Sequence, residues 1–83
     1  MIHVDGNSIA GLLEELFGRD MTLASGRCTG CGAEREVGAL HVYRAAGIVV
    51  RCPDCDTVLL RIVEGRDRMW VDSRGLSTMQ VLS

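Results

Sequence analysis

The chain has 83 residues and a mass of 9.0 kDa, and its 47% hydrophobic residues and single proline are typical of a folded chain rather than a disordered one. We expect residues 1–83 to form a single domain whose hydrophobic core is small enough to need additional fastening. A formal charge of −2 and a pI near 5.5 argue against non-specific binding to nucleic acids or acidic membranes, because a field of that sign repels phosphate groups.

The N-terminal region shows no export or membrane signal. Asp5, Glu14 and Glu15 interrupt its apolar residues ahead of the first arginine, Arg19. No run in the sequence approaches the ~18 apolar residues that a membrane-spanning helix needs. We therefore expect no signal peptide, no membrane contact and a cytoplasmic location. There, thiols stay reduced, and paired cysteines more often bind metal than form disulfides.

The first predicted element is a helix over residues 7–18. Its apolar side chains fall at helical offsets and form one stripe, made of Ile9, Leu12, Leu13, Leu16 and Phe17. Asp5 or Asn7 can cap the start of this helix, and Gly18 can end it. The stripe needs a partner surface. We favour packing on the chain's own sheet, and the alternative is a homodimer through Ile9, Leu13 and Phe17 or the groove of another protein.

From residue 21 onward, short runs of β-forming residues alternate with glycines, which predicts a mainly antiparallel sheet. The ribbon and sheet are expected within residues 21–82, with strands at 21–27, 35–43, 47–51, 57–64 and 68–72. Two hairpins are predicted, turning at 45–47 and at 64–67, where Gly65 can take a positive φ. Residues 73–83 either add an edge strand through 79–82 or cover the helix.

Four cysteines form two C-x2-C pairs separated by the 20 residues 32–51, namely Cys28, Cys31, Cys52 and Cys55. Two residues between cysteines let one tight turn aim both sulfurs at a single ion, while backbone N–H groups of the same turn point at the thiolates. The residue after each second cysteine often needs a left-handed conformation, which suits Gly32 and is tolerated by Asp56. The pattern predicts one closed four-thiolate site, with Zn²⁺ as the default occupant in a structural role.

The sequence leaves other uses of the four cysteines open. Two disulfides would suit a secreted chain. A redox C-x2-C at Cys52 and Cys55 would normally open a helix in a βαβ unit, whereas strands flank the pair here. Iron is the main alternative to zinc, because thiolate ligation does not discriminate between the two metals. The segments CTGCG and CPDCD resemble the two knuckles of rubredoxins, which are small electron carriers with one iron.

Four longer segments carry a family resemblance: DGNSIAGLLEELFGRDMT, GRCTGCG, RCPDCDTVLLRIV and GRDRMWVDSRGL. Together they make nearly the whole chain resemble a family of small bacterial, mostly actinobacterial, zinc-ribbon proteins known only as a domain of unknown function. The resemblance implies a small α+β fold, in which one N-terminal helix accompanies a rubredoxin-like zinc ribbon with an antiparallel β-sheet. It matches the cysteine positions of that family to Cys28, Cys31, Cys52 and Cys55, and it implies no activity.

Single residues outside the cysteine pairs carry weaker signals. His3 can complete a square-planar nitrogen set for Cu(II) or Ni(II) with the terminal amine, but most third-position histidines are accidental. We expect His41 to be a structural or surface residue. Trp70 alternates with Met69 and Val71 and so faces opposite to them; it is expected to contact the core or the helix, and the alternative is an exposed recognition anchor. The last hairpin gathers four arginines, Arg61, Arg66, Arg68 and Arg74. They are expected to form a solvated face, and the alternative is contact with phosphates.

The sequence gives no indication of an enzyme, since it shows no paired carboxylates, no nucleophile–base pair and no glycine-rich phosphate loop. The expected function is a non-catalytic zinc-binding ribbon module that mediates protein–protein interaction, with one structural Zn²⁺ per chain. The alternatives are a rubredoxin-like iron electron carrier and a zinc ribbon that binds nucleic acid.

Overall fold

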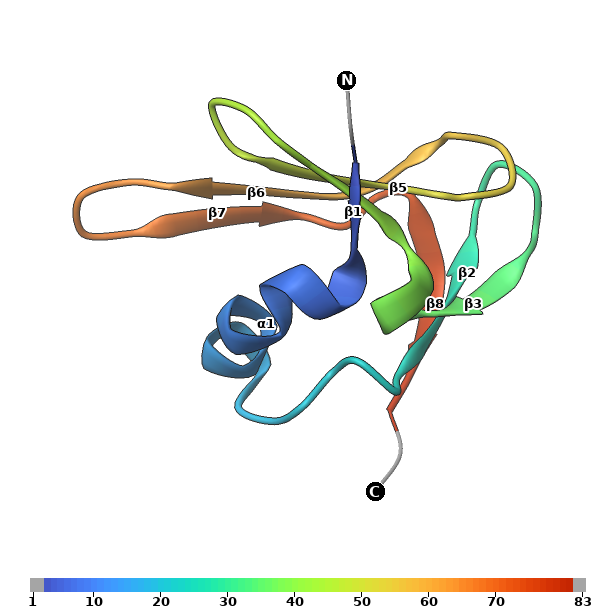
Figure 1. The fold of residues 1–83 in the computed structure, drawn as a ribbon, viewed down its shortest axis with the longest axis horizontal. Coiled ribbons are helices and arrows are strands. Elements are labelled where there is room, and N and C mark those ends of the chain that lie inside the picture. The colour runs from blue at the N-terminus through green and yellow to red at the C-terminus, as the bar shows by residue number, and fades with distance from the viewer. Residues whose placement is uncertain (1–2, 82–83) are drawn as a thin grey trace.

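The computed structural model describes residues 3–81 as a small α+β structure with one short helix and two antiparallel sheets (Figure 1). Among these residues, no helix combines the length and the apolar character needed to cross a membrane.

The helix follows a short strand near the N-terminus. The elements in this part of the chain are β1 (Val4–Asp5), the 3₁₀ turn η1 (Gly6–Ile9) and α1 (Ala10–Phe17). The Asp5 carboxylate accepts a hydrogen bond of 3.1 Å from the backbone N–H of Asn7 at the start of η1. Gly18 ends α1 in a left-handed conformation with φ 75°. The predicted helix is therefore confirmed, except that its first turn is 3₁₀.

The larger sheet has five strands in the order β1-β4-β5-β6-β7. Its further strands are β4 (His41–Arg44), β5 (Ile48–Arg51), β6 (Val58–Glu64) and β7 (Met69–Asp72). Both predicted hairpins are confirmed, as β4–β5 and β6–β7. The conformation expected at Gly65 is wrong, since the only glycines with positive φ among residues 3–81 are Gly18 and Gly32. Gly65 instead leaves space for the Trp70 ring, because a Cβ at this position would lie 2.8 Å from Trp70 Cζ3.

The smaller sheet has three strands in the order β3-β2-β8, namely β2 (Ser25–Cys28), β3 (Glu34–Glu36) and β8 (Leu76–Gln80). Of the two placements open for residues 73–83, the edge strand is the one found, and it begins at Leu76 rather than at 79. The strand predicted at 21–27 begins only at Ser25, because residues 21–24 form a turn in which Ala24 N–H donates to the Met21 carbonyl oxygen at 3.1 Å.

The strand predicted over 35–43 is not one strand: its two ends are strands, but they belong to different sheets. A 3₁₀ turn, η2 (Val37–Ala39), separates β3 from β4. Its buried Gly38 packs tightly, since a Cβ there would lie 3.0 Å from Asn7 Oδ1 and 3.1 Å from the Thr22 carbonyl oxygen. The chain therefore leaves the small sheet at η2 and enters the large one at β4.

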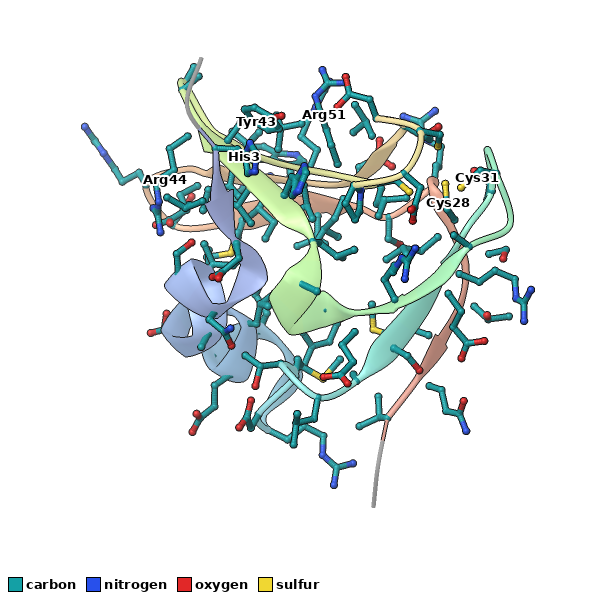
Figure 2. All side chains as sticks on the ribbon, turned by 45° about the vertical axis from the view of Figure 1, so that its right-hand side comes forward. His3, Cys28, Cys31, Tyr43, Arg44 and Arg51 are labelled. Carbon is teal, nitrogen blue, oxygen red and sulfur yellow. The ribbon has the colours of Figure 1, made fainter. Side chains whose placement is uncertain are left out.

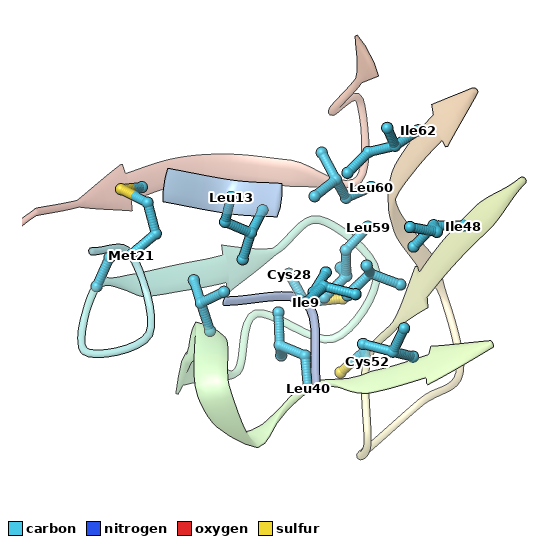
Figure 3. Close-up of a cluster of buried hydrophobic side chains, with 14 residues drawn as sticks. Ile9, Leu13, Met21, Cys28, Leu40, Ile48, Cys52, Leu59, Leu60 and Ile62 are labelled. Carbon is cyan, nitrogen blue, oxygen red and sulfur yellow. The ribbon is translucent and has the colours of Figure 1, made fainter. Parts of the chain in front are cut away.

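The hydrophobic core lies between the helix and both sheets (Figure 3). Fourteen buried residues form it: Ile9, Leu13, Met21, Ala24, Cys28, Val37, Leu40, Val42, Ile48, Val50, Cys52, Leu59, Leu60 and Ile62. Ile9 and Leu13 are 2% and 1% exposed, so the helix stripe packs within its own chain. Of the three residues considered for a helix-mediated homodimer, only Phe17 is exposed, at 42%.

The placement expected for Trp70 is wrong, because its side chain is 56% exposed. Trp70 pairs with Val63 across the β6–β7 hairpin and shares with it the face of the large sheet opposite the buried Ile62. Figure 1 shows this hairpin extending outward from the rest of the molecule. The hairpin therefore presents its aromatic residue to solvent.

Candidate metal centre

One cysteine pair comes from each sheet. Cys28 is the last residue of β2 and Cys31 lies in the turn that leads to β3, whereas Cys52 and Cys55 lie in the turn between β5 and β6. Figure 2 shows Cys28 and Cys31 at the end of the small sheet. The four sulfur atoms all lie within 4.8 Å of one another. The fold thus brings together all four cysteines that the sequence singled out.

The two turns have the same local geometry, which explains why the same spacing occurs twice. In the first turn, Gly32 N–H donates to the Cys28 carbonyl oxygen at 3.0 Å, and in the second, Asp56 N–H donates to the Cys52 carbonyl oxygen at 2.9 Å. The left-handed conformations expected after each second cysteine are confirmed, with φ 77° at Gly32 and 65° at Asp56.

Backbone N–H groups also point at the sulfurs, as expected for thiolate ligands. Gly30 N–H donates to Cys28 Sγ at 3.2 Å, and Asp54 N–H donates to Cys52 Sγ at 3.4 Å. Each turn therefore orients its first cysteine through its own backbone and supplies a donor that stabilises negative charge on sulfur.

The sulfur separations fit a tetrahedral ion better than a disulfide. Sγ of Cys28 lies 3.5 Å from Sγ of Cys55, and Sγ of Cys31 lies 3.7 Å from Sγ of Cys52. Four thiolates at ~2.3 Å from a central zinc would be ~3.8 Å apart, whereas a disulfide bond is ~2.05 Å long. The donor set therefore fits one divalent ion, and all four cysteines are free.

The thiols influence one another strongly because they are so close. Burial raises the pKa of Cys28, but hydrogen bonds from the backbone at Cys31 and Gly30 and from the other thiols outweigh this and lower it to about 6. At Cys31, the Ala33 backbone hydrogen bond favours the thiolate, yet desolvation and the neighbouring thiols raise its pKa to about 12. The first thiolate of the cluster therefore forms more easily than the later ones, and a bound cation would balance the charge of all four.

Three residues that the sequence analysis missed surround the sulfurs. Arg35 on β3 makes two hydrogen bonds of 2.8 and 2.7 Å to the carboxylate of Asp54 in the second turn, and these bonds hold the pKa of Asp54 below its usual range. Thr57 Oγ1 lies 3.0 Å from Cys55 Sγ, where its hydroxyl can donate to a thiolate. The C-x2-C spacing carries no signal for Arg35, since it lies 19 residues from Asp54.

The two histidines lie together, His3 just before β1 and His41 at the start of β4. The rings of His3 and His41 stack with centroids 3.7 Å apart, and Tyr43 lies 5.7 Å from His3 (Figure 2). His41 is half-buried in β4, in line with the structural or surface role expected for it. The copper or nickel set considered for His3 depends on residues 1–2, which lie outside the described residues.

The arginines of the last hairpin have acidic neighbours. Arg74 forms an ion pair of 2.6 Å with Asp72, which also lies opposite Arg61 across the β6–β7 pair. Arg68 lies 3.7 Å from Asp67 and places its guanidinium carbon 5.9 Å from the centre of the Trp70 ring. These contacts favour the solvated face expected for the arginines.

Comparison with known proteins gives a family and no activity. No curated protein and no solved structure matches the chain. The model of one family, described as "Family of unknown function (DUF6510)", matches residues 1–83. Since this match covers the whole length, the chain belongs to the DUF6510 family of unknown function.

Proposed function

We propose that this chain is a non-catalytic zinc-ribbon module of the cytoplasm that holds one structural Zn²⁺ and acts by binding other proteins. The observation that carries the proposal is the cluster of four cysteine sulfurs within 4.8 Å. Four thiolates fill the tetrahedral shell of zinc and leave no position for a water or substrate. Bound zinc would therefore supply folding free energy rather than hydrolytic chemistry.

The position of the cluster supports a structural role. Cys28 and Cys52 are buried in the core, and the two pairs belong to different sheets. An ion bound to all four sulfurs would join the sheets at one point, in the way a disulfide joins two segments in a secreted domain of similar size.

A role in protein binding is supported by the surface rather than by the metal site. Three large hydrophobic residues on the β6–β7 hairpin are exposed, Val63 at 38%, Trp70 at 56% and Val71 at 43%. Of these, Val63 and Trp70 lie opposite each other on one face of the hairpin, and adjoining exposed apolar side chains that include an aromatic ring are typical of protein interfaces. The net charge of −2 and the acidic neighbours of Arg68 and Arg74 disfavour nucleic acid as the ligand.

Elemental analysis tests the metal part of the proposal. Untagged protein, expressed in medium containing both iron and zinc, is analysed for metals, and a visible spectrum of the same sample is recorded. We expect one zinc per chain and no colour. One iron per chain with a reversible redox spectrum would overturn the proposal in favour of an electron carrier, and the absence of any metal would remove its basis.

A binding titration tests the preference for protein over nucleic acid. The zinc-loaded protein is titrated with short single-stranded DNA and RNA at low salt, where electrostatic binding is strongest. We expect no binding. Salt-dependent binding that is lost when Arg66 and Arg68 are changed to glutamate would establish the nucleic-acid alternative.

A further inference from the structure

Strand β7 forms one edge of the five-stranded sheet. The exposed Trp70 and Val71 belong to this strand, and the exposed Val63 lies directly opposite Trp70 on β6. Edge strands with exposed apolar side chains readily pair with another strand, and many proteins prevent this with prolines, bulges or lysines. The segment Met69–Asp72 contains no proline, its one charged residue is Asp72 at its end, and its pairing with β6 shows no bulge.

The hydrogen-bond pattern of the hairpin fixes which backbone groups of β7 face outward. At the turn, Gly65 N–H donates to the Arg68 carbonyl oxygen at 2.7 Å, so these two residues form a hydrogen-bonded pair. Such pairs alternate along an antiparallel ladder, which directs the backbone of Trp70 and Asp72 toward β6. The N–H and C=O groups of Met69 and Val71 therefore point away from the sheet and can pair with a new strand.

The sequence around Trp70 is complementary to itself when it is read in the antiparallel direction. In an antiparallel pair of two copies centred on Trp70, Met69 lies opposite Val71, and the tryptophans lie opposite each other. Arg68 then lies opposite Asp72 of the second copy, at both ends of the pair. This register also makes Met69 and Val71 a hydrogen-bonded pair, as their outward backbone groups require.

We propose that β7 is a self-association edge, where the β7 strands of two copies of this chain pair antiparallel about Trp70 and join their sheets into one ten-stranded sheet. The charges favour a second copy over an unrelated strand, because each copy supplies one cation and one anion at matching positions. Arg68 is free to turn toward the new partner, since its contact with Asp67 is 3.7 Å long and both side chains are largely exposed. Asp72 already accepts from the backbone N–H and the guanidinium of Arg74, but the Arg74 side chain is 91% exposed, so Arg68 of the second copy can share or replace this contact.

The proposed seam is small, so the association is weak and depends on concentration. It consists of one short strand from each copy with the side chains around Trp70 and Val63. Interfaces of this kind fall below the ~1,200 Å² of a standard protein complex. The dimer therefore forms at high protein concentration and dissociates on dilution.

The test is sedimentation velocity of the zinc-loaded protein over about a hundredfold range of concentration, because a weak dimer is visible only at the upper end. We expect the mass to rise from the 9.0 kDa of one chain toward twice that value. Val71→Pro removes an outward N–H without touching the bonds to β6, and it should abolish association. Val71→Thr keeps the N–H and the branched side chain and should associate as the unchanged protein does.

Charge reversal tests the register. Arg68→Glu and Asp72→Arg should each weaken self-association at least tenfold, because each puts like charges opposite one another at both ends of the pair. An equimolar mixture of the two variants should recover association, since both ends of the mixed dimer then hold opposite charges. Arg66→Glu makes the same charge change in the turn, outside the seam, and serves as the matched control.

Three results would overturn the proposal. The first is a monomer at every concentration. The second is a dimer that Val71→Pro leaves intact, since that dimer would use another surface. The third is a failure of the charge tests: Arg66→Glu weakens association as much as Arg68→Glu does, or the mixture of Arg68→Glu and Asp72→Arg does not restore it. In either case the proposed register would be wrong.

Discussion

At the scale of single residues, the backbone after each cysteine pair shows how closely the turns constrain the sequence. Gly32 and Asp56 both have a left-handed backbone, with φ 77° and 65°. A residue with a Cβ is disfavoured in this conformation by about 1–2 kcal/mol, and aspartate is among the few that adopt it as single residues. The two turns therefore need the same left-handed backbone conformation, which glycine adopts in the first and aspartate in the second.

Replacing Gly32 tests this constraint. We expect Gly32→Ala to lower the free energy of unfolding of the zinc-loaded protein by about 1 kcal/mol, as measured in urea, because alanine must adopt the left-handed conformation. Gly11→Ala is the matched control, since Gly11 lies in α1 and a Cβ there would meet nothing within 4 Å. The control should raise stability by roughly 0.5–1 kcal/mol. Equal effects of the two substitutions would contradict the argument.

Arg35 is placed to act on the cysteine cluster through Asp54 and through its own charge. Hydrogen bonds to Asp54 and the negative charge of Asp54 raise the pKa of the Arg35 guanidinium, and the charges of Cys52 and Cys31 raise it further. Arg35 therefore stabilises thiolates of the cluster as well as the turn that carries Cys52. We expect Arg35→Gln to weaken zinc binding by about tenfold, as measured by competition with a chelating dye. Arg19→Gln, an exposed substitution beyond the end of α1, should leave the affinity unchanged. The idea fails if both variants bind zinc as the unchanged protein does.

At the scale of elements, the helix divides its apolar stripe between core and solvent. Leu13 is 1% exposed and Phe17, one turn later, is 42% exposed. We expect Leu13→Ala to lower the free energy of unfolding by about 2–5 kcal/mol, because it leaves a cavity in the core. Phe17→Ala should cost less than Leu13→Ala, although phenylalanine is the larger side chain. Thermal unfolding of the two variants makes the comparison, and a larger loss for Phe17→Ala would show that this residue has a partner surface.

The elements that the sequence predicted correctly are those governed by local rules. The 3₁₀ turn that leads into the helix has a cap at Asp5, Gly18 ends the helix, and the two hairpins have alternating strands around short turns. The geometry of each cysteine turn followed from spacing alone, because each turn is built from its own backbone. These features need no knowledge of the rest of the fold.

The features that were missed depend on contacts between distant segments. The run over 35–43 contains β-forming residues such as Val37, Val42 and Tyr43, yet η2 interrupts it at Gly38, which packs against Asn7 and Thr22. Alternation placed Trp70 on the opposite face from Met69 and Val71, but it cannot say which face of a sheet a helix will cover. The hydrogen bonds from Arg35 to Asp54 in the second cysteine turn join segments of the two sheets, so no local sequence pattern predicts them.

At the scale of the whole molecule, the two sheets meet at the apolar core and at the cysteine cluster. β8 follows β7 in the chain but belongs to the other sheet, and η2 links the two sheets a second time. Among residues 3–81, 14 buried residues form the core, and the helix that packs on it has only eight residues. A core of this size gives only marginal stability, and a bound metal ion would supply the additional stabilising free energy.

Removal of the metal should therefore unfold both sheets together. Structural zinc contributes on the order of 10 kcal/mol in small domains, which is comparable to the whole stability of such a domain at roughly 5–15 kcal/mol. We expect chelation, or Cys31→Ser, to abolish the dispersed amide spectrum in strands of the large and the small sheet at once, and added zinc to restore it for the unsubstituted chain only. Ser25→Ala, in β2 but outside the cluster, is the control and should keep its fold. A different result would contradict this prediction. If amides of β4, β5 and β6 stay protected from hydrogen exchange without metal while those of β2 and β8 do not, the large sheet folds independently and the ion only attaches the small sheet to it.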